Sequence, residues 1–401
     1  MKPIVYREIE GRSAGYLALL GVLGLLAAMG LGSAYYMEHH GHIVTGMTNQ
    51  IVWGMPHVFA VFLIVAASGA LNVASIGSVF GKTMYKPLGP LSALLALALL
   101  AGGLTILVLD LGRPDRLLIA ATVYNFKSIF AWNMILYSGF FAIVGVYLWM
   151  QMDKMMYKYA KPAGFAAFIW RLVLTTGTGS IFGFLVARQA FDSAILAPMF
   201  VVMSFSYGLA IFLLVLMAAY AWSGRPLGDS VINRLKNLQG VFIAGALYFV
   251  VVFHLTNLYF TKYHGVESFI LLNGGGITSL FWLGQIILGS LVPLAMLYHP
   301  KLGKSRTAIG VACVLVVLGG LAQMYVTLIG GQAYPLSLFP GYQESSSFFD
   351  GAVHGYSASL PELLLGIGGF AVALILVAVA VKFLRFLPES LDNHAVDPHS
   401  K

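Results

Sequence analysis

Three polar side chains lie at the edges of long apolar stretches, where a charge is costly. His57 begins one stretch, Asp110 ends the next, and Arg113 follows within the run DLGRP at 110–114. An imidazole titrates near neutrality and can pass a proton to a carboxylate. These residue types indicate a site that exchanges protons with a small polar group. Asp110 and Arg113 are three residues apart and are expected to pair, either within such a site or as a structural contact at a helix end.

Four further polar side chains interrupt apolar stretches. His254 and Asn257 are three residues apart and therefore share a helix face. Glu362 begins the last stretch, and Arg171 lies within the fifth. Ionisable groups inside a membrane are expensive, so each is a candidate functional residue. Together with Asp110 they could form a proton path, and they could equally be structural ties between helices.

The composition explains why so few groups stand out. Of 401 residues, 59% are hydrophobic and 9% are charged, whereas soluble domains carry about 25% charged residues. This excludes an ordinary soluble enzyme, a disordered chain and a nucleic-acid-binding domain. The basic residues are scattered in short loops, so no nucleic-acid partner is expected. The predicted fold class is an all-α polytopic membrane protein in contact with the lipid bilayer.

Ten apolar stretches are long enough to cross a bilayer, which needs about 20 residues per helix. The first is too long for a cleavable signal and is expected to remain as a span. The chain then divides into an N-terminal tail (1–14), a transmembrane domain (15–386) and a C-terminal tail (387–401) that is expected to be disordered. The expected spans are 15–36, 57–80, 88–109, 129–150, 164–186, 197–221, 238–260, 277–298, 306–330 and 361–383.

The distribution of basic residues predicts the orientation. Of 23 Lys and Arg residues, 17 lie in the tails and loops on one side and 5 in the loops on the other. The positive-inside rule places both termini in the cytoplasm, and the expected location is the cytoplasmic (inner) membrane of a bacterium or archaeon. The long outer loop 331–360 is expected to form an ordered cap or a docking surface. The residues that fall near the outer face are His57, Asp110, Arg113, His254 and Glu362.

Several polar groups at one depth favour a quinone site near the outer face. A quinone head group needs a hydrogen-bonding partner at its carbonyls, an apolar slot and a proton route to water. His57 supplies the titrating group, and Asp110 can relay its proton outward. The apolar walls are expected from Trp53, Trp132, Phe59 and Phe130.

Other chemistries fit the residues less well. A single haem between His57 and His254 is conceivable. The three histidines at 39–42 lie on a loop without a matching distant ligand, so a solvated loop is preferred over a metal site. Cys313 is the single cysteine, which excludes an internal disulfide and a cysteine-ligated cluster. A secondary transporter is also compatible with ten spans and many glycines.

The run DLGRP at the end of the third span resembles a signature of the NrfD/polysulfide-reductase family of membrane subunits. Trp132 and Asn133 follow at the start of the fourth span, and Val52-Trp53-Gly54 precedes the second. GGQAY at 330–334 and LPELL at 360–364 are similar to the end of the ten-span branch, which includes the membrane subunit of a periplasmic nickel–iron hydrogenase. Within that branch the sequence looks most like the DsrP-type subunits of sulfur-metabolism complexes. The similarity covers nearly the whole chain.

The resemblance implies an architecture and partners. It implies two four-helix bundles, at about 57–186 and 197–330, with spans one and ten added. Such a subunit binds menaquinone or ubiquinone and holds no haem, metal or iron–sulfur cluster of its own. It exchanges electrons with a periplasmic ferredoxin-like iron–sulfur protein. A multihaem cytochrome c and other membrane and cytoplasmic redox subunits are the further expected partners.

The resemblance also implies site residues. The family's quinone-contacting histidine falls on His57 and its acidic position on Asp110. The asparagine one turn before that histidine is Gly54 here. A quinone-contacting tyrosine has no counterpart, so Thr178 and Ser180 are the candidates for a weaker role. The expected quinone-binding set is completed by Arg113, Trp53, Trp132 and Asn133.

Overall fold

The structure, a computed structural model, describes residues 4–336 and 351–396. These ranges contain ten helices long and apolar enough to cross a membrane, which confirms the predicted all-α polytopic fold. The spans are α1 (Ala14–His40), α2 with α3 (Met55–Ala70, Asn72–Ser78), η2 with α4 (Thr83–Leu88, Gly89–Leu109), α6 (Ile129–Met152), η4 with α7 (Tyr157–Tyr159, Ala160–Gly183), α8 (Leu196–Ser223), α9 (Asp229–Tyr259), α11 with η7 and α12 (Gly276–Ser279, Leu280–Leu291, Val292–Tyr298), α13 with η9 and α14 (Arg306–Tyr325, Val326–Gly330, Gly331–Ala333), and α15 (Leu360–Phe383).

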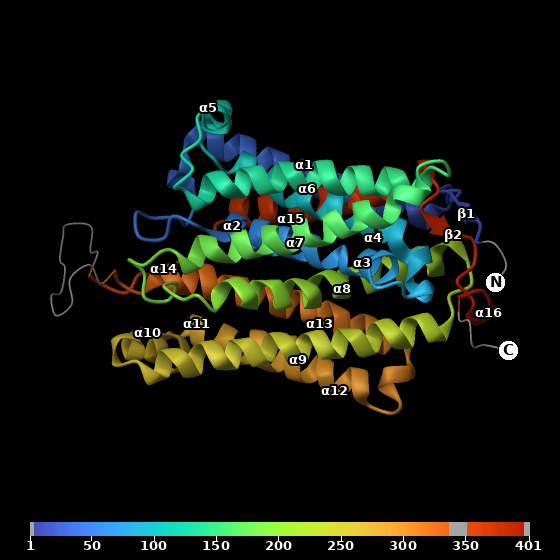
Figure 1. The fold of residues 1–401 in the computed structure, drawn as a ribbon. Helices are drawn as coiled ribbons and strands as arrows, with labels where there is room; N and C mark the ends of the chain where they lie inside the picture. The colour runs from blue at the N-terminus through green and yellow to red at the C-terminus, as the bar shows by residue number, and fades with distance from the viewer. Residues whose placement is uncertain (1–3, 337–350, 397–401) are drawn as a thin grey trace.

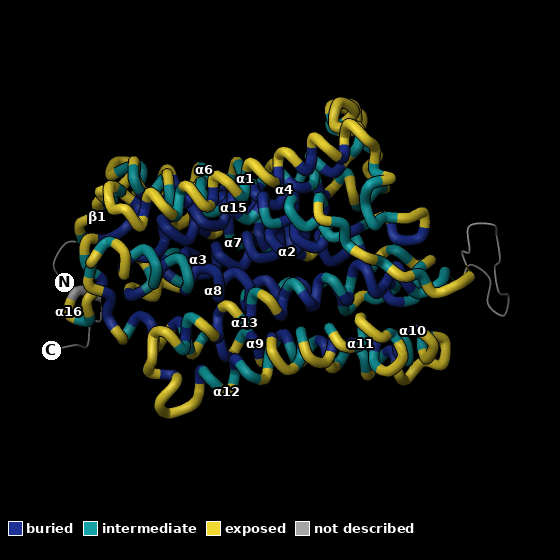
Figure 2. Tube along the Cα trace, turned by 180° about the vertical axis from the view of Figure 1, so that it is seen from behind, coloured by how far each residue is buried: buried dark blue, intermediate teal, exposed yellow. Residues whose placement is uncertain are grey.

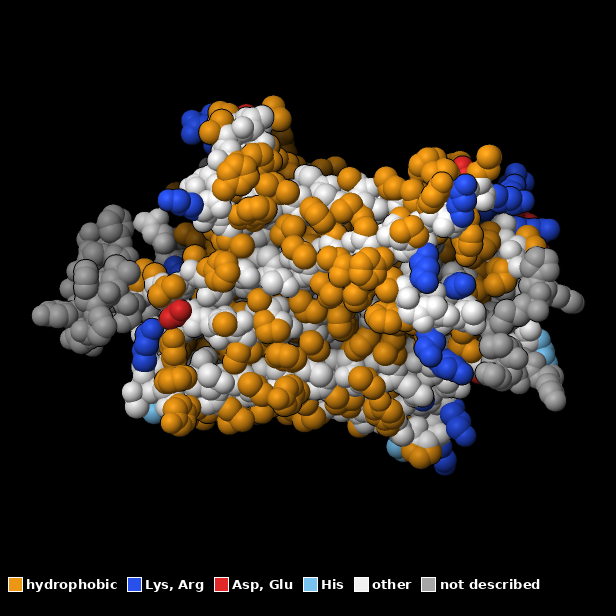
Figure 3. Space-filling view, in the orientation of Figure 1, with side chains coloured by type: hydrophobic (Ala, Val, Ile, Leu, Met, Phe, Trp, Pro, Cys, Tyr) orange, Lys and Arg blue, Asp and Glu red, His pale blue; other side chains and the backbone are white. Residues whose placement is uncertain are grey.

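The short elements lie at the two ends of the bundle (Figure 1). One end, called the basic end, carries both chain termini, β1 (Tyr6–Arg7), β2 (Leu387–Pro388) and α16 (Asn393–Val396). Lys and Arg side chains gather there in Figure 3, whereas hydrophobic side chains cover the middle of the molecule. The opposite end, called the site end, carries η1 (His42–Val44), η3 (Pro114–Arg116), α5 (Leu117–Thr122), α10 (His264–Ser268) and η6 (Phe269–Asn273).

The helices form two groups that meet along α2 and α8. In the first, α2 packs on α4 and α7, and α6 packs on α4 and α7. In the second, α8 packs on α9 and α13, and η7 packs on α13. The added helix α15 packs on α4 and α2, and α1 covers α15. In Figure 2 α2 lies among other helices and is dark along its length.

The sequence of α2 explains its central place. It reads MPHVFAVFLIVAASGA, which is apolar on every face, so either lipid or protein can surround it, and its small residues allow neighbouring helices to pack closely against it. Its small residue Gly69 lets the backbone of α8 approach closely. A methyl group added at Gly69 would overlap the carbonyl oxygen of Ser204, and one added at Gly208 would overlap the backbone nitrogen of Ala70.

The carboxyl tail differs from its prediction. Residues 387–396 are ordered, because β2 pairs antiparallel with β1, and the side chains of Phe386, Leu387 and Leu391 are buried. Apolar residues at 386, 387 and 391 are the signal that the overall polar composition of the tail obscured. Positions 397–401 of that tail lie outside the described residues, as do positions 337–350 of the outer loop that was expected to form a cap.

The glycine contact between α2 and α8 gives a first prediction. Gly69→Ala is expected to destabilise the protein by about 1–3 kcal/mol or more, because the added methyl group overpacks the helix crossing. Gly145→Ala is the matched control, since a methyl group there meets nothing within 4 Å. Thermal unfolding of the two variants in detergent measures the effect. Equal melting temperatures would show that the crossing can relax.

Candidate functional site

The candidate site is built around the buried carboxylate of Asp110 at the site end. Asp110 caps α4, and its side chain is only 1% exposed. His57 lies in the first turn of α2, next to Pro56, and its Nδ1 is 3.0 Å from Oδ2 of Asp110. The His57 ring is about one quarter exposed, so one side of the pair stays accessible. The two residues singled out in the sequence are therefore brought together.

A second imidazole reaches the same carboxylate. His42 Nε2 lies 3.8 Å from Oδ1 of Asp110, so the prediction that this histidine belongs to a merely solvated loop is wrong. Gly112 adopts a φ of +65° and lies beside the His42 ring. A methyl group added to its Cα would be 3.4 Å from Cε1 of that ring. The ring nitrogens and carboxylate oxygens at these contacts make no aligned hydrogen bond to another side chain or to the backbone of the described residues. Buried polar atoms without an aligned partner are uncommon in folded proteins, so this cluster is set apart from the other polar contacts of the bundle.

Arg113 does not belong to this centre. It pairs with Asp115 at 3.0 Å, and both side chains are more than half exposed, so the expected ion pair with Asp110 is wrong. The reason is the turn at Gly112, which ends the helical spacing on which the expectation was based. The hydrogen bond from Arg113 lowers the pKa of the Asp115 carboxyl group.

An aromatic cluster lies beside His57. The Trp53 ring has its centroid 6.5 Å from that of His57, 6.2 Å from Phe130 and 5.6 Å from Phe182. Phe191 joins the cluster at 6.4 Å from Trp53. Trp53 and Phe130, two of the residues expected to line a quinone, thus lie in one cluster, and that role stays a prediction. Phe182 and Phe191 were missed because they come from the end of α7 and the connection after it, which the sequence does not place near α2.

Two other expected wall residues lie elsewhere. Phe59 packs edge-on against Phe370 of α15, so it points away from the Trp53 cluster and its prediction is wrong. Trp132 packs on Phe126 and donates from its indole nitrogen to the carbonyl oxygen of Phe126 at 2.9 Å. It therefore stabilises the loop before α6.

A polar clamp fixes the turn that carries Trp53. The side-chain oxygen of Gln332 accepts hydrogen bonds from the backbone nitrogens of Val52 and Trp53, each at 3.0 Å. Arg188 donates to the carbonyl oxygens of Gln332 and Gln50 at 2.9 and 2.7 Å. Gln332 belongs to the motif GGQAY, for which the sequence suggested no structural role. It positions Trp53 from the other bundle.

The remaining expected residues of the first bundle are buried near the same end. Asn133 donates to the carbonyl oxygens of Ile129 and Gly177, which ties α6 to α7, while its own oxygen is buried without a hydrogen-bond partner among the described residues. Thr178 donates to the backbone of its own helix at 3.0 Å. Ser180 is buried two residues further along α7. The role of these residues in quinone binding stays a prediction.

Glu362 is fully buried and held by fixed donors. Its Oε2 accepts from the backbone nitrogens of Gly46 and Ser359, each at 2.8 Å, and Tyr356 donates its hydroxyl to Oε1 at 2.6 Å. Burial and the adjacent carboxylate raise the pKa of Tyr356, so the phenol keeps its proton. A methyl group at Gly54 would overlap Oε1. The smaller residue at this family position therefore makes room for Glu362.

Arg171 lies in the middle of α7 with an exposed fraction of only 1%. It donates to the side-chain oxygen of Asn72 at 2.9 Å and to the backbone of Ser68, and the Phe168 and Phe205 rings cover its guanidinium at 4.9 and 5.1 Å. In the part of the chain that the structure describes, no carboxylate forms an ion pair with it. These contacts tie α7 to α2 and α3.

A second imidazole–carboxylate pair lies in the other bundle. His254 Nδ1 is 2.6 Å from Oε2 of Glu267, and Asn257 donates to Oε1 at 2.8 Å. The common face of His254 and Asn257 was predicted, but Glu267 was missed. It lies between the expected spans 238–260 and 277–298, where α10 and η6 fold back on the bundle and bury it completely.

The chain is similar to known membrane subunits over most of its length. The family described as Polysulphide reductase, NrfD, matches residues 43–335, which is more than half of the chain. An "Hdr-like menaquinol oxidoreductase integral membrane subunit" of Archaeoglobus fulgidus is 29% identical over 98% of this chain and 99% of its own. The C subunit of a selenate reductase of Mesobacillus selenatarsenatis is 22% identical over 93% and 95%.

A shorter relative matches the same region. The C component of the polysulfide reductase of Wolinella succinogenes is 24% identical over 71% of this chain and 96% of its own.

Within the residues that the structure covers, no group of three or more His, Cys, Asp or Glu side chains is arranged to hold a metal ion. The long family match, the ten spans and the DLGRP turn lead to one conclusion: this chain belongs to the NrfD/polysulphide reductase family of membrane subunits.

Proposed function

We propose that the His57–Asp110 pair is the site at which this protein exchanges protons with a membrane quinone. The observation that carries the proposal is a carboxylate removed from water and approached by two imidazoles, one of which remains accessible. A carboxylate that is buried without a cation is stabilised by a neighbouring group that donates a hydrogen bond or a proton to it. The aromatic cluster around Trp53 provides an apolar surface beside that donor, as an isoprenoid quinone requires.

The residues suit an acid–base role. A quinol substrate gives up two electrons and two protons when it is oxidised. His57 receives a proton at its exposed ring edge, and the Asp110 carboxylate stabilises the resulting imidazolium. His42, less buried than Asp110, offers a route from the carboxylate to the water at the site end. In quinone reduction the same residues work in the opposite direction.

We further propose that the protein is the quinone-linked membrane subunit of a respiratory redox complex. The Archaeoglobus relative's name supports menaquinol as the substrate, and the selenate and polysulfide reductase relatives support a multi-subunit reductase or oxidoreductase. The electron partner is a periplasmic ferredoxin-like iron–sulfur protein docked at the site end, with a multihaem cytochrome c among the other subunits. A DsrP-type sulfur-metabolism complex is the assembly that the sequence resembles best. The basic end then faces the cytoplasm of the bacterial or archaeal cell.

We propose a second role, proton movement, for the His254–Glu267 pair. A proton can be shared across the 2.6 Å contact, and a cavity of about 30 Å³ beside it is lined by polar Gln285, Gln323 and Thr327. Tyr207 donates to Gln323 and extends the polar chain toward α8. Three π-helical segments, η6, η7 and η9, surround this region. Such segments occur frequently at functional sites because they displace side chains from regular helical positions.

The first test concerns the quinone site in the purified complex. His57→Gln and Asp110→Asn are each expected to lower quinol-dependent electron transfer by about 10²–10⁴-fold, because proton acceptance at the site is lost. Asp115→Asn, which changes an exposed carboxylate of the neighbouring turn, is expected to keep the wild-type rate. Subunit composition after size exclusion checks that each complex assembles. Wild-type turnover in both site variants would refute the assignment.

The second test concerns proton movement in proteoliposomes that contain the whole complex. Glu267→Gln is expected to keep quinol turnover and lose most of the proton transport per electron, because the shared proton is lost from the second bundle. His264→Gln changes an exposed histidine of the same segment and serves as the control. An unchanged proton-to-electron ratio in Glu267→Gln, or no transmembrane proton transport by the wild-type complex, would exclude this role.

A further inference from the structure

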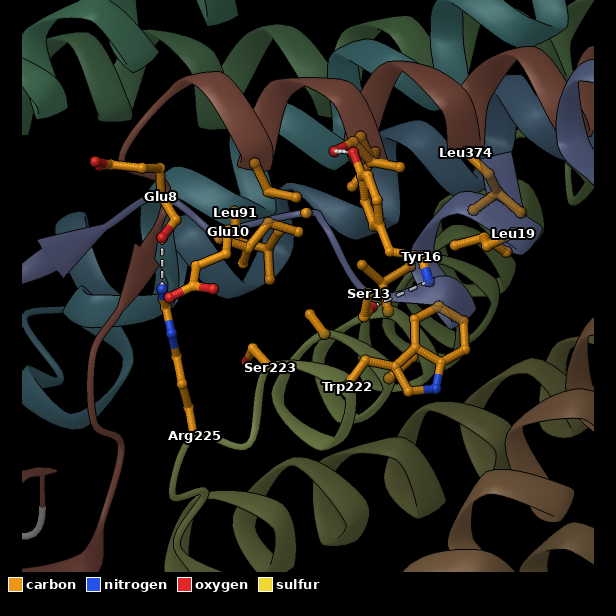
Figure 4. Close-up of a pocket in the computed structure, with 18 of the residues that line it drawn as sticks. Glu8, Glu10, Ser13, Tyr16, Leu19, Leu91, Trp222, Ser223, Arg225 and Leu374 are labelled. Carbon is orange, nitrogen blue, oxygen red and sulfur yellow. Dashed lines mark hydrogen bonds between the residues drawn. The ribbon is translucent and has the colours of Figure 1, made fainter. Parts of the chain in front are cut away.

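A groove opens at the basic end, far from the His57–Asp110 pair. It has a volume of about 750 Å³ and lies between the N-terminal segment, α1, α8 and α15. Figure 4 shows Glu10 and Arg225 extending into the opening on one side and Trp222 on the other. Nothing in the proposed redox function uses this space.

The groove has the dimensions of a lipid site in one leaflet. Its apolar lining runs from Tyr16 to Leu23 on α1 and from Trp222 to Leu214 on α8, which is about 10–12 Å at 1.5 Å per residue. This depth approaches half of a hydrocarbon core of about 30 Å. Trp222 is 61% exposed at the mouth, where tryptophan is typical of the membrane–water interface. The polar mouth and apolar depth therefore match an amphipathic molecule that enters from the bilayer.

The charges at the mouth indicate which head group fits. Arg7 is neutralised by Glu389 and Glu8 by Arg385, each at 3.3 Å. Arg225 is held by backbone carbonyl oxygens, including that of Glu8 at 2.7 Å, so no carboxylate neutralises it in the described ranges.

Two charged side chains at the mouth remain available. Arg12 and Glu10 both line the groove, and in the part of the chain that the structure describes neither forms an ion pair. The mouth thus presents guanidinium groups and one carboxylate to a ligand. An uncharged quinone ring would leave all of these charges unpaired, whereas a zwitterionic head group can pair with both signs.

We infer that this groove binds an aminophospholipid, a diacyl lipid whose phosphate carries a primary ammonium group. Arg12 holds the phosphate, since guanidinium groups bind phosphate oxygens with charge-assisted hydrogen bonds, and the positive charge of Arg225 lies nearby without a neutralising carboxylate. Glu10 accepts hydrogen bonds from the ammonium group. The acyl chains lie along Leu19 and Leu374. The lipid fills the gap between the N-terminal segment and α8. Without it, α1 packs mainly against α15.

The test measures lipid binding to the full-length protein after delipidation in detergent. Phosphatidylethanolamine, phosphatidylcholine and phosphatidylglycerol with identical acyl chains are titrated, and bound lipid is counted by native mass spectrometry. Phosphatidylethanolamine is expected to bind most tightly. Glu10→Gln is expected to weaken it about three- to fivefold, the range of an exposed ion pair, and to leave phosphatidylglycerol unchanged. Arg12→Gln is expected to weaken both.

Two further variants complete the design. Lys304→Gln, an exposed residue on another loop of the basic end, is expected to change nothing. Ala218→Phe fills the apolar part of the groove and is expected to remove binding of all three lipids. Equal affinity for the three head groups, no effect of Glu10→Gln, or displacement of the lipid by added menaquinone would overturn the inference. Glu10 and Arg12 are exposed, so folding of their variants is not at risk, and quinol turnover in the same samples reports separately on the redox proposal.

Discussion

A carboxylate withdrawn from water inside a helical bundle must be compensated by nearby donors, because the desolvation of a single ion costs several kcal/mol. Three carboxylates at the site end meet this constraint in different ways. Glu362 has two backbone nitrogens and a phenol, which are fixed and do not titrate near neutrality. Glu267 has an imidazole and an amide, and Asp110 has two imidazoles. The identity of the donors therefore distinguishes Glu362, held by fixed groups, from the two carboxylates for which we propose a role in proton exchange.

The same constraint links the site to the packing of the bundles. Asp110 reaches His57 because α4 and α2 run side by side, and α2 is held in place on its other side by the close contact of Gly69 with α8. Gln332, at the end of the ninth span, fixes the turn before α2. The imidazole, its carboxylate and the aromatic wall thus come from different spans, and small shifts between the bundles would change all three together.

Much of this could be predicted from the sequence, since the length and composition of apolar stretches indicate spans without tertiary information. Asp110 and His57 could be matched because both flank spans on the same side. Glu267 and His42 could not be assigned to these clusters from the sequence. Their segments lie between spans and fold back onto the bundle, which only the tertiary structure shows. The prediction of an Arg113–Asp110 ion pair was wrong for a local reason: the left-handed turn at Gly112 interrupts the helical spacing on which it was based. The prediction of a disordered carboxyl tail was wrong because three apolar side chains in a mostly polar segment are buried against the bundle.

Arg171 has a consequence for the insulation of the membrane. Its guanidinium lies in the middle of a span, with neutral oxygens and aromatic rings around it. A fixed positive charge in a low-dielectric interior repels other cations, as arginine does in pores that exclude protons. A hydronium ion entering the first bundle from either face would be repelled by this charge. In the function proposed above, this fixed charge would oppose proton leakage through the same bundle that holds the His57–Asp110 pair.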